Sequence, residues 1–250
     1  MNGWQGLLVF VAGIWAGAIN TVVGSGTLIT FPVLLSVGLP PVTANVSNSV
    51  GLFPGSLVGA WGYRRELVGQ SGRLVRLGVA TGIGAIIGVV LLLTLPADAF
   101  NAIVPVLIGL ALVLVVFGKQ LTARLAHTRH RPTKTVTPML FTATLLTGIY
   151  GGYFGAAQGV LLMGVFGILL ADSLQRQNGL KNGVTGLSNL IAAIAFCFTA
   201  HIDWVAAGLI AAGAILGGLL GARIGRRLPP AVLRAVIVVI GIAAIVKLVA

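Results

Sequence analysis

Residues 20–32, NTVVGSGTLITFP, interrupt an apolar N-terminal segment with polar residues and glycines before a short apolar run resumes. Glycine-rich backbone that faced lipid would leave N–H and C=O groups without hydrogen-bond partners, which is costly in a bilayer. Such backbone occurs at membrane depth where it is buried in protein or lines a water-filled cavity. If the chain lies in a membrane, this break therefore indicates a site inside the protein.

The amino-acid composition is that of a membrane protein. Of the 250 residues, 57% are hydrophobic and 8% are charged, and the mean hydropathy is +1.06. Soluble domains carry about 25% charged residues. Apolar runs of about 20 residues, the length of a transmembrane helix, recur along the chain. We therefore expect an all-α, polytopic helical membrane protein that lies in the lipid bilayer and has no soluble domain.

The net charge of +12 comes mainly from three basic clusters, each beside an apolar run. Their members are Arg64, Arg65, Arg73 and Arg76; Lys119, Arg124, Arg129, Arg131 and Lys134; and Arg223, Arg226 and Arg227. Short basic loops beside membrane spans are typical of the cytoplasmic side. We therefore expect no nucleic-acid partner, but a multi-pass protein of the plasma (inner) membrane whose basic loops are cytoplasmic.

The two halves of the chain resemble each other. GIWAG at 13–17 matches GIYGG at 148–152, and AIIG at 85–88 matches AILG at 214–217. Because the matches keep their order, we predict an internal duplication. The predicted units are a first transmembrane repeat at 1–123, a basic cytoplasmic linker at 124–135 and a second transmembrane repeat at 136–250.

Each repeat contains five apolar segments, the second of which is short. They lie near 4–19, 27–38, 42–62, 72–95 and 100–122 in the first repeat and near 136–154, 160–171, 178–199, 203–225 and 229–249 in the second. About 12 residues form roughly 18 Å of helix, less than the ~30 Å of a hydrocarbon core. The short segments are therefore either half-helices or arms of a re-entrant hairpin.

An odd number of segments per repeat places the second repeat upside down in the membrane. The charges agree, because loop 63–76 carries four arginines whereas its counterpart at 199–204 carries neither Lys nor Arg. The second repeat has its basic cluster one loop later, at 223–227. We therefore expect two inverted repeats with broken or re-entrant helices near the bilayer midplane, as in secondary transporters. With the linker inside, both termini should lie outside.

The two breaks form the candidate substrate-binding site. Gly24 and Gly26 let the backbone approach a ligand closely. A helix that starts near Ser25 or Thr27 offers free N–H groups and its positive dipole end to an anion, and these two hydroxyls can cap it or bind the ligand. The candidates are Asn20, Thr21, Gly24, Ser25, Gly26 and Thr27 in the first break and Gln158 and Gly159 in the second, where Gly159 aligns with Gly24. Alternatively, the glycines only permit close helix packing, the role we expect for those of GIWAG and GIYGG.

The segment after each short one adds polar side chains. These are Asn45, Ser47, Asn48 and Ser49 in the first repeat and Asn178, Lys181, Asn182, Thr185, Ser188 and Asn189 in the second. The second set has helical spacing, so it forms one stripe that should face the bundle interior. Lys181 either extends to the cytoplasmic surface or provides the counter-charge for an anion. The aligned amides and hydroxyls favour the anion.

The acidic residues and the cysteine limit the possible chemistry. The acids are Glu66, Asp98, Asp172 and Asp203, all near segment ends. Cation pumps and carboxylate proton relays need an acid within the membrane, so the interior suits a small anionic substrate, with or without a coupled proton. One cysteine, Cys197, excludes a cysteine-cluster metal site, and we expect no cofactor or metal. Ser25 has no membrane-embedded His or Asp to activate it, so we do not expect an enzyme.

Residues 16–67 resemble the first-half signature of the TauE/SafE sulfite exporter family: a Gly-rich break, a proline, a G-x-P-P-x-x-A turn and a small-residue helix ending in Tyr and basic residues. GGYFGAAQGVLL at 151–162 and NGLKN at 178–182 resemble the second-half signature, including a lysine at Lys181. The resemblance covers nearly the whole chain. It implies a plasma-membrane carrier for small sulfur-containing anions such as sulfite, thiosulfate or sulfonates. Because Cys197 lies outside both breaks, the resemblance does not imply a cysteine-relayed thiosulfate route.

Together these features predict a transporter. The exact anion, the direction, the coupling ion and the oligomeric state are left open. The expected mechanism is transport of a small sulfur-containing anion, such as sulfite or an organosulfonate, by alternating access between two inverted repeats. The alternative is an anion channel or a membrane subunit without transport activity.

Overall fold

The computed structural model describes residues 1–126, 132–224, 238–239 and 242, and this part of the chain contains nine named helices and no named strand. The helices are α1 (Gly3–Val22), α2 (Thr27–Ser36), α3 (Pro41–Gly62), α4 (Ser71–Thr94), α5 (Ala97–Ala126), α6 (Pro138–Tyr153), α7 (Gln158–Leu169), α8 (Leu174–Thr199) and α9 (Trp204–Ile224). The all-α fold is confirmed. Most of the segment predicted at 229–249 lies outside the described residues, and α5 extends past the boundary predicted at residue 123.

Two short helices follow the predicted breaks. Helix α2 has 10 residues and α7 has 12. Gly24 and Gly155 lie in the breaks with φ of +88° and +74°, a conformation that glycine adopts at little cost. The first break turns the chain back onto α1, since a Cβ on Gly26 would lie only 2.6 Å from the Ala16 carbonyl oxygen.

The helix ends correct one detail of the repeat alignment. Gly24 and Gly155 are each the second residue after a helix ends, so Gly155, and not Gly159, is the structural counterpart of Gly24. The direct alignment missed this because α1 has about one more turn than α6 between its packed glycine and the break. The packed glycines are Gly17 in α1 and Gly152 in α6.

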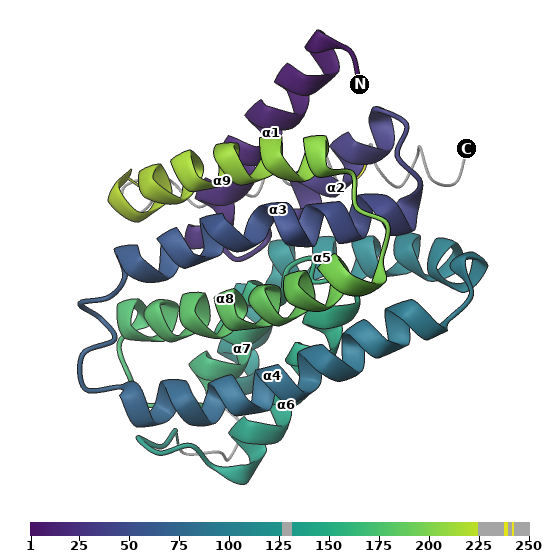
Figure 1. Ribbon diagram of the computed structural model, residues 1–250. Helices are drawn as coiled ribbons and strands as arrows, with labels where there is room; N and C mark the ends of the chain where they lie inside the picture. The colour runs from purple at the N-terminus through teal and green to yellow at the C-terminus, as the bar shows by residue number, and fades with distance from the viewer. Residues whose placement is uncertain (127–131, 225–237, 240–241, 243–250) are drawn as a thin grey trace.

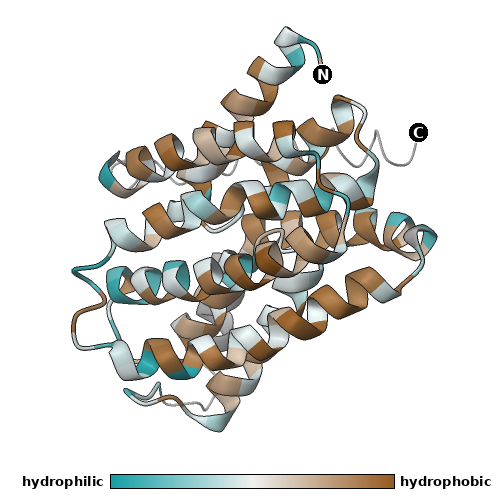
Figure 2. Ribbon diagram, viewed as in Figure 1, coloured by the Kyte–Doolittle hydropathy of each residue, from teal (hydrophilic) through white to brown (hydrophobic). Residues whose placement is uncertain are grey.

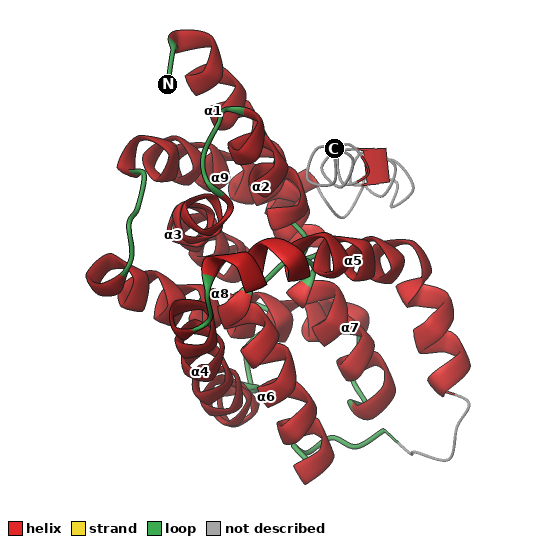
Figure 3. Ribbon diagram, turned by 90° about the vertical axis from the view of Figure 1, so that its right-hand side faces the viewer, coloured by secondary structure: helices red, strands yellow, loops and turns green. Residues whose placement is uncertain are grey.

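Four long helices, α9, α3, α8 and α4, lie side by side in that order, with α1 on α9 and α6 on α4 (Figure 1). Helices α2, α5 and α7 lie to one side of this row (Figure 3). Helix α2 packs on α1 and α3 as α7 packs on α6 and α8. Each of these helix contacts in one half thus has a counterpart in the other half. This is the pattern expected when a two-fold axis relates the two halves. The inversion of the halves in the membrane stays a prediction.

Small residues bring the α1–α9 and α4–α6 pairs close together. A Cβ on Gly17 would lie 2.3 Å from the Ala214 carbonyl oxygen, and a Cβ on Gly152 would lie 2.2 Å from the Ala85 carbonyl oxygen. Real Cβ atoms do not approach oxygen so closely, so any larger residue would separate the helices. The packing role predicted for the GIWAG and GIYGG glycines is confirmed.

Five of the described helices, α1, α4, α5, α8 and α9, contain segments long and apolar enough to cross a membrane. Large apolar side chains cover their outer faces, and Trp4, Val106 and Phe198 are 72%, 69% and 85% exposed. In Figure 2, brown marks the hydrophobic residues that make up much of these helices. Helix α3 is not among the five because its Asn and Ser residues lower its hydropathy; it packs between α8 and α9. The protein is a multi-pass membrane protein.

Aromatic side chains join the second break to the first short helix. Phe31 on α2 packs edge-on against Phe154 in the second break, with ring centroids 5.2 Å apart. Phe100 on α5 packs on the same ring at 6.2 Å. All three side chains are buried, so this cluster stabilises the region where the two halves meet.

Candidate functional site

The two breaks meet in the interior of the protein. The Gly159 N–H donates a hydrogen bond to the Gly24 carbonyl oxygen at 3.0 Å. A Cβ on Gly24 would lie 2.4 Å from Gly159 Cα. This approach is closer than any residue with a Cβ allows. The sequence placed both glycines in the site, and the structure adds that they touch each other.

The head of α2 gathers buried hydrogen-bond donors. They are the backbone N–H groups of Ser25, Gly26 and Thr27 and the hydroxyl of Ser25, which is 1% exposed. Within the described residues, none of these groups has a hydrogen-bond partner. The positive end of the α2 dipole lies at the same place, so this head is suited to bind an anion.

Neither hydroxyl caps α2, so of the two roles predicted for Ser25 and Thr27, capping is excluded and ligand binding stays a prediction. The N-cap residue is Gly26, and no side chain bonds to the helix start. The Thr27 hydroxyl instead accepts a hydrogen bond from Asn48 Nδ2 at 3.2 Å. Asn48 Oδ1 in turn accepts a hydrogen bond from the Thr30 hydroxyl. Asn48 thus ties α3 to α2 and leaves the hydroxyl of Ser25 unused.

Lys181 lies inside the protein and is 0% exposed. Its Nζ donates hydrogen bonds to the carbonyl oxygens of Asn20 and Thr21, both at 3.0 Å. Asn182 Nδ2 also donates to the Thr21 carbonyl oxygen, at 3.2 Å. These carbonyls belong to the last turn of α1, where a helix leaves its carbonyl groups without intrahelical partners. The alternative in which Lys181 extends to the surface is wrong, because these carbonyls hold its ammonium group in the interior.

Asn45 makes the corresponding contact with the other half. Its Nδ2 donates to the carbonyl oxygen of Tyr153, the last residue of α6, at 2.9 Å. Helix α8 therefore caps the broken end of α1, while α3 caps the broken end of α6. Each half supplies the donors that the other half's interrupted helix needs.

A second polar contact joins α1, α3 and α8. Ser56 Oγ accepts hydrogen bonds from Asn20 Nδ2 at 3.1 Å and from Asn189 Nδ2 at 2.9 Å. Asn20 and Asn189 were predicted site residues, whereas Ser56 was not. The sequence spacing could have identified Ser56, because Ser56 follows Asn48 by about two helical turns. The two side chains therefore lie on a similar face of α3.

Three predicted site residues have other hydrogen-bond partners. Ser47 Oγ accepts from the Asp203 N–H at 2.9 Å and so holds the start of α9. Ser49 Oγ donates to the Asn45 carbonyl oxygen at 2.9 Å within its own helix. Thr185 Oγ1 donates to the carbonyl oxygen of Lys181 at 2.9 Å. These bonds give the three hydroxyls structural roles in α3 and α8.

Gln158 and Asn178 are buried and only partly satisfied. The Gln158 side chain packs over Gly151, where a Cβ would lie 2.4 Å from Gln158 Cδ. Within the described residues, Gln158 Nε2 and Asn178 Oδ1 have no hydrogen-bond partner. A buried amide group without a hydrogen-bond partner is costly, and a bound ligand would provide that partner. The role of these two side chains in ligand binding stays a prediction.

The acidic side chains lie at helix ends and in loops, as expected. Asp98 is in the first turn of α5, Glu66 follows α3, and Asp203 Oδ1 accepts from the Ala206 N–H at 2.9 Å at the head of α9. Over the described ranges, no three His, Cys, Asp or Glu side chains are placed to hold a metal ion.

Asp172 forms the centre of an ion-pair cluster between the halves. Its carboxylate lies 2.5 Å from Arg73 Nη1 and 3.0 Å from Arg176 Nε. Burial raises the pKa of Asp172, but hydrogen bonds from Arg73, the Ser173 N–H and Arg176 lower it more. The net effect holds the pKa of Asp172 below its ordinary value, so this cluster is charged at neutral pH.

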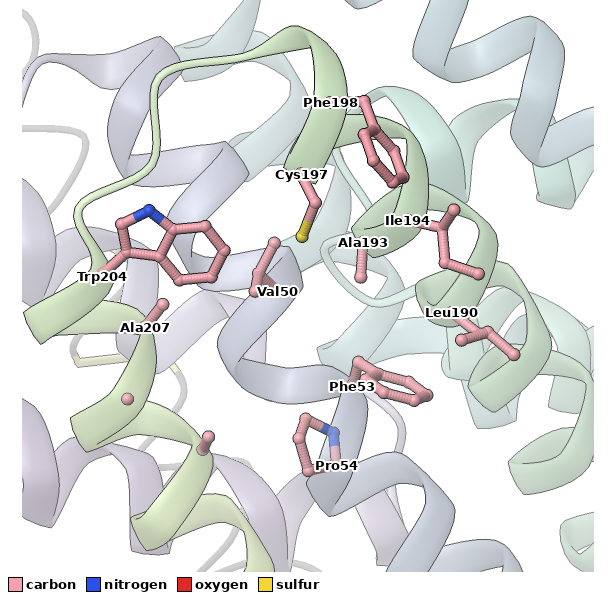
Figure 4. Close-up of a pocket in the computed structure, with 12 residues that line it drawn as sticks. Val50, Phe53, Pro54, Leu190, Ala193, Ile194, Cys197, Phe198, Trp204 and Ala207 are labelled. Atoms are coloured by element: carbon pink, nitrogen blue, oxygen red, sulfur yellow. The ribbon is translucent and has the colours of Figure 1, made fainter.

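An apolar groove of about 500 Å³ lies between α3, α8 and α9 (Figure 4). Its lining includes Phe53, Cys197, Phe198 and Trp204 but none of the predicted site residues. An anion would lose its hydration there without gaining hydrogen bonds, so the groove is not suited to bind it. Cys197 lines this groove, which contains no residue of either break.

Comparisons with known proteins agree with this architecture. The sequence model of the family described as Sulfite exporter TauE/SafE matches residues 9–248. A probable membrane transporter protein, ORF9 of Sinorhizobium sp., is 29% identical over 245 residues, which cover 97% of this chain and 91% of the relative. The probable membrane transporter protein YfcA of Escherichia coli K12 is 28% identical over 227 residues, which cover 89% and 80%. No solved structure matches the chain. Since the family match spans nearly its whole length, the chain belongs to the sulfite exporter TauE/SafE family of membrane transporters.

Proposed function

We propose that the protein carries a small anion across the membrane and binds it at the head of α2, where the two breaks meet. The observation that supports this most is the buried charge of Lys181, which is 0% exposed and forms no ion pair with a described carboxylate. A buried ammonium group is costly unless opposite charge or oriented dipoles compensate it. The α1 carbonyls compensate part of this cost, and a bound anion would compensate the rest.

The donors at the head of α2 would hold the anion. The N–H groups of Ser25, Gly26 and Thr27, together with the Ser25 hydroxyl, fit the oxygens of an oxyanion. They follow the Lys181-bound turn of α1 by only a few residues. No described carboxylate lies in the interior to repel a negative charge.

Membership of the sulfite exporter TauE/SafE family supports a sulfur-containing substrate. Sulfite and organosulfonates spread their negative charge over three oxygens, which match a cluster of hydrogen-bond donors. We therefore propose sulfite or an organosulfonate as the substrate. The described interior has no carboxylate to carry a coupled proton, so such a proton would travel on sulfite, as hydrogensulfite; a sulfonate is too weak a base to carry it.

Alternating access is the mechanism that the arrangement of the two halves supports. The halves meet at the Gly24–Gly159 contact, and each caps the interrupted helix of the other. Inverted repeats that rock about a central site expose it to one side at a time. In this proposal the protein lies in the plasma membrane, with the basic loops in the cytoplasm and both termini outside.

Ligand-dependent thermal unfolding of the purified protein would test the binding site. Sulfite, thiosulfate, sulfate, taurine, sulfoacetate and acetate would be compared, and we expect one sulfur oxyanion to stabilise the protein. Ser25→Ala should weaken the affinity for that anion at least about tenfold, because a hydrogen bond to a charged group is worth about 1.5–3 kcal/mol. The anion should then stabilise the variant less than the wild type at the same concentration. Ser188→Ala is the matched control, since Ser188 is also fully buried with an unpartnered hydroxyl within the described residues. Stabilisation by none of the sulfur compounds, or an unchanged response in Ser25→Ala, would contradict the proposed site.

Liposome uptake of the stabilising anion would separate a carrier from a channel. A carrier shows saturable flux, and unlabelled anion on the far side accelerates the entry of labelled anion. A channel shows neither property, and a membrane subunit without transport activity shows no flux. Counterflow is therefore the result that we expect.

A further inference from the structure

A positive charge holds the broken end of α1. The carbonyl oxygens of Asn20 and Thr21 accept hydrogen bonds from Lys181 Nζ at 3.0 Å each. The C-terminus of a helix carries a partial charge of about −0.5, so a cation there is stabilising. Lys181 supplies that cation from α8, a helix of the other half.

Sodium-coupled carriers place a metal cation at the same kind of position. In such transporters, unwound carbonyls and the C-terminal ends of interrupted helices coordinate the coupling ion. Here the ammonium group of Lys181 binds two carbonyl oxygens at the C-terminal end of an interrupted helix. Its side chain also passes close to the contact between the halves, because a Cβ on Gly159 would lie 3.1 Å from Lys181 Cδ.

An ammonium group has three N–H donors, and the α1 carbonyls use two of them. Within the described residues, the third has no partner, so an oxygen of a bound anion can accept from it. One charge can therefore face both the negative end of α1 and the substrate. In sodium-coupled carriers the coupling Na⁺ supplies the positive charge at such a helix end.

We propose that Lys181 is a tethered replacement for a coupling sodium ion, and that transport by this protein does not require Na⁺. This inference rests on the proposed anion transport. Because the ammonium group is covalently attached, it provides a positive charge at the site without crossing the membrane. Removing it should leave a carbonyl site that a free cation can fill.

Thermal unfolding of the purified Lys181→Ala protein tests the cation site directly. Chloride salts of Na⁺, ethylammonium and choline would be compared at equal ionic strength, choline being too large for the space left by a lysine side chain. Na⁺ or ethylammonium should raise the unfolding temperature of Lys181→Ala by about 3 °C over choline, as a bound ligand does. The unfolding temperatures of the wild type and of Lys134→Met, which changes an exposed lysine, should not depend on the salt.

An equal unfolding temperature of Lys181→Ala in all three salts would overturn the proposal. If Lys181→Ala does not fold, Lys181→Ser opens the same space for the same comparison.

Uptake of sulfite and of taurine by wild-type liposomes in Na⁺, K⁺ or choline buffers is the second test. A coupled ion changes affinity by about 5–150-fold, so we expect the rates in the three buffers to differ by less than about fivefold. A requirement for Na⁺ would overturn the proposal. If the wild type transports neither compound nor any other anion, the proposed function fails, while the unfolding experiment still decides whether Lys181 occupies a cation site.

Discussion

At the scale of single residues, the contact between Gly24 and Gly159 determines how closely the two halves approach. Gly24 must be glycine for two reasons, its positive φ of +88° and the lack of space for a Cβ. Gly159 lies in the first turn of α7 without a positive φ, so alanine suits its backbone there. The backbone of Gly24, at 2.5 Å, and the Lys181 side chain, at 3.1 Å, oppose a Cβ at position 159.

We predict that Gly159→Ala destabilises the protein. Its Cβ would lie 2.5 Å from Gly24 Cα, and overpacking of this kind costs about 1–3 kcal/mol. The unfolding temperature in detergent should fall by several degrees. Gly208→Ala is the control, because a Cβ there meets nothing within 4 Å, and alanine favours the helix. Equal stability of Gly159→Ala and the wild type would mean that the breaks do not touch.

At the scale of helices, ion pairs join the ends of α4 and α8 on one face of the protein. Asp172 pairs with Arg73 at the start of α4 and with Arg176 at the start of α8. Arg73 Nε also donates to the Lys134 carbonyl oxygen at 2.8 Å, and Arg176 Nη1 donates to the Val68 carbonyl oxygen at 3.2 Å. This cluster ties loops of both halves to the linker and therefore restrains their relative movement.

We predict that Asp172→Asn destabilises the protein in a pH-dependent way. At neutral pH the loss should be about 2 kcal/mol, the range of a hydrogen bond to a charged group. Because the pKa of folded Asp172 is lowered, its contribution is present at pH values above the ordinary carboxyl value of 3.8 and is lost as the pH falls below it. The difference in unfolding temperature between wild type and variant should thus persist from neutral pH to mildly acidic pH and shrink below 3.8.

Asp98→Asn is the control for the Asp172 experiment. Asp98 lies in the first turn of α5 and has no ion pair with a described residue, so its loss should cost less than about 1 kcal/mol. If Asp172→Asn were no less stable than Asp98→Asn at neutral pH, the ion pairs would not restrain the halves.

At the scale of the whole molecule, the two-fold relation of the halves and the charge of the loops predict the orientation in the membrane. The loop after α3 carries the exposed Arg64 and Arg65, whereas the loop before α9 carries the exposed His201 and no Lys or Arg. Basic loops are retained in the cytoplasm. The loop with His201 should therefore lie outside.

Cysteine labelling would test this orientation. The chain has one cysteine, Cys197, so Cys197→Ser provides a background without reactive thiols. In that background, a membrane-impermeant maleimide should label His201→Cys in intact cells and should label Arg65→Cys only after the membrane is opened. The reverse pattern would show that the basic loops lie outside.

Local sequence was enough to predict the helical class, the two short helices and the close packing of the GIWAG and GIYGG glycines. Each depends on hydropathy, segment length or residue size, which a short stretch of chain contains. The spacing of Lys181 and Asn182 likewise predicted a polar stripe on one face of α8. These features do not depend on which helix lies opposite.

The hydrogen-bond partners of that stripe required the folded chain. The acceptors of Lys181 are carbonyl oxygens of Asn20 and Thr21, and backbone carbonyls have no signature in the sequence. The same holds for the contact between Gly24 and Gly159, which depends on how the two halves pack together. A residue type shows which groups can donate or accept hydrogen bonds, whereas the packing of distant segments decides which of them meet.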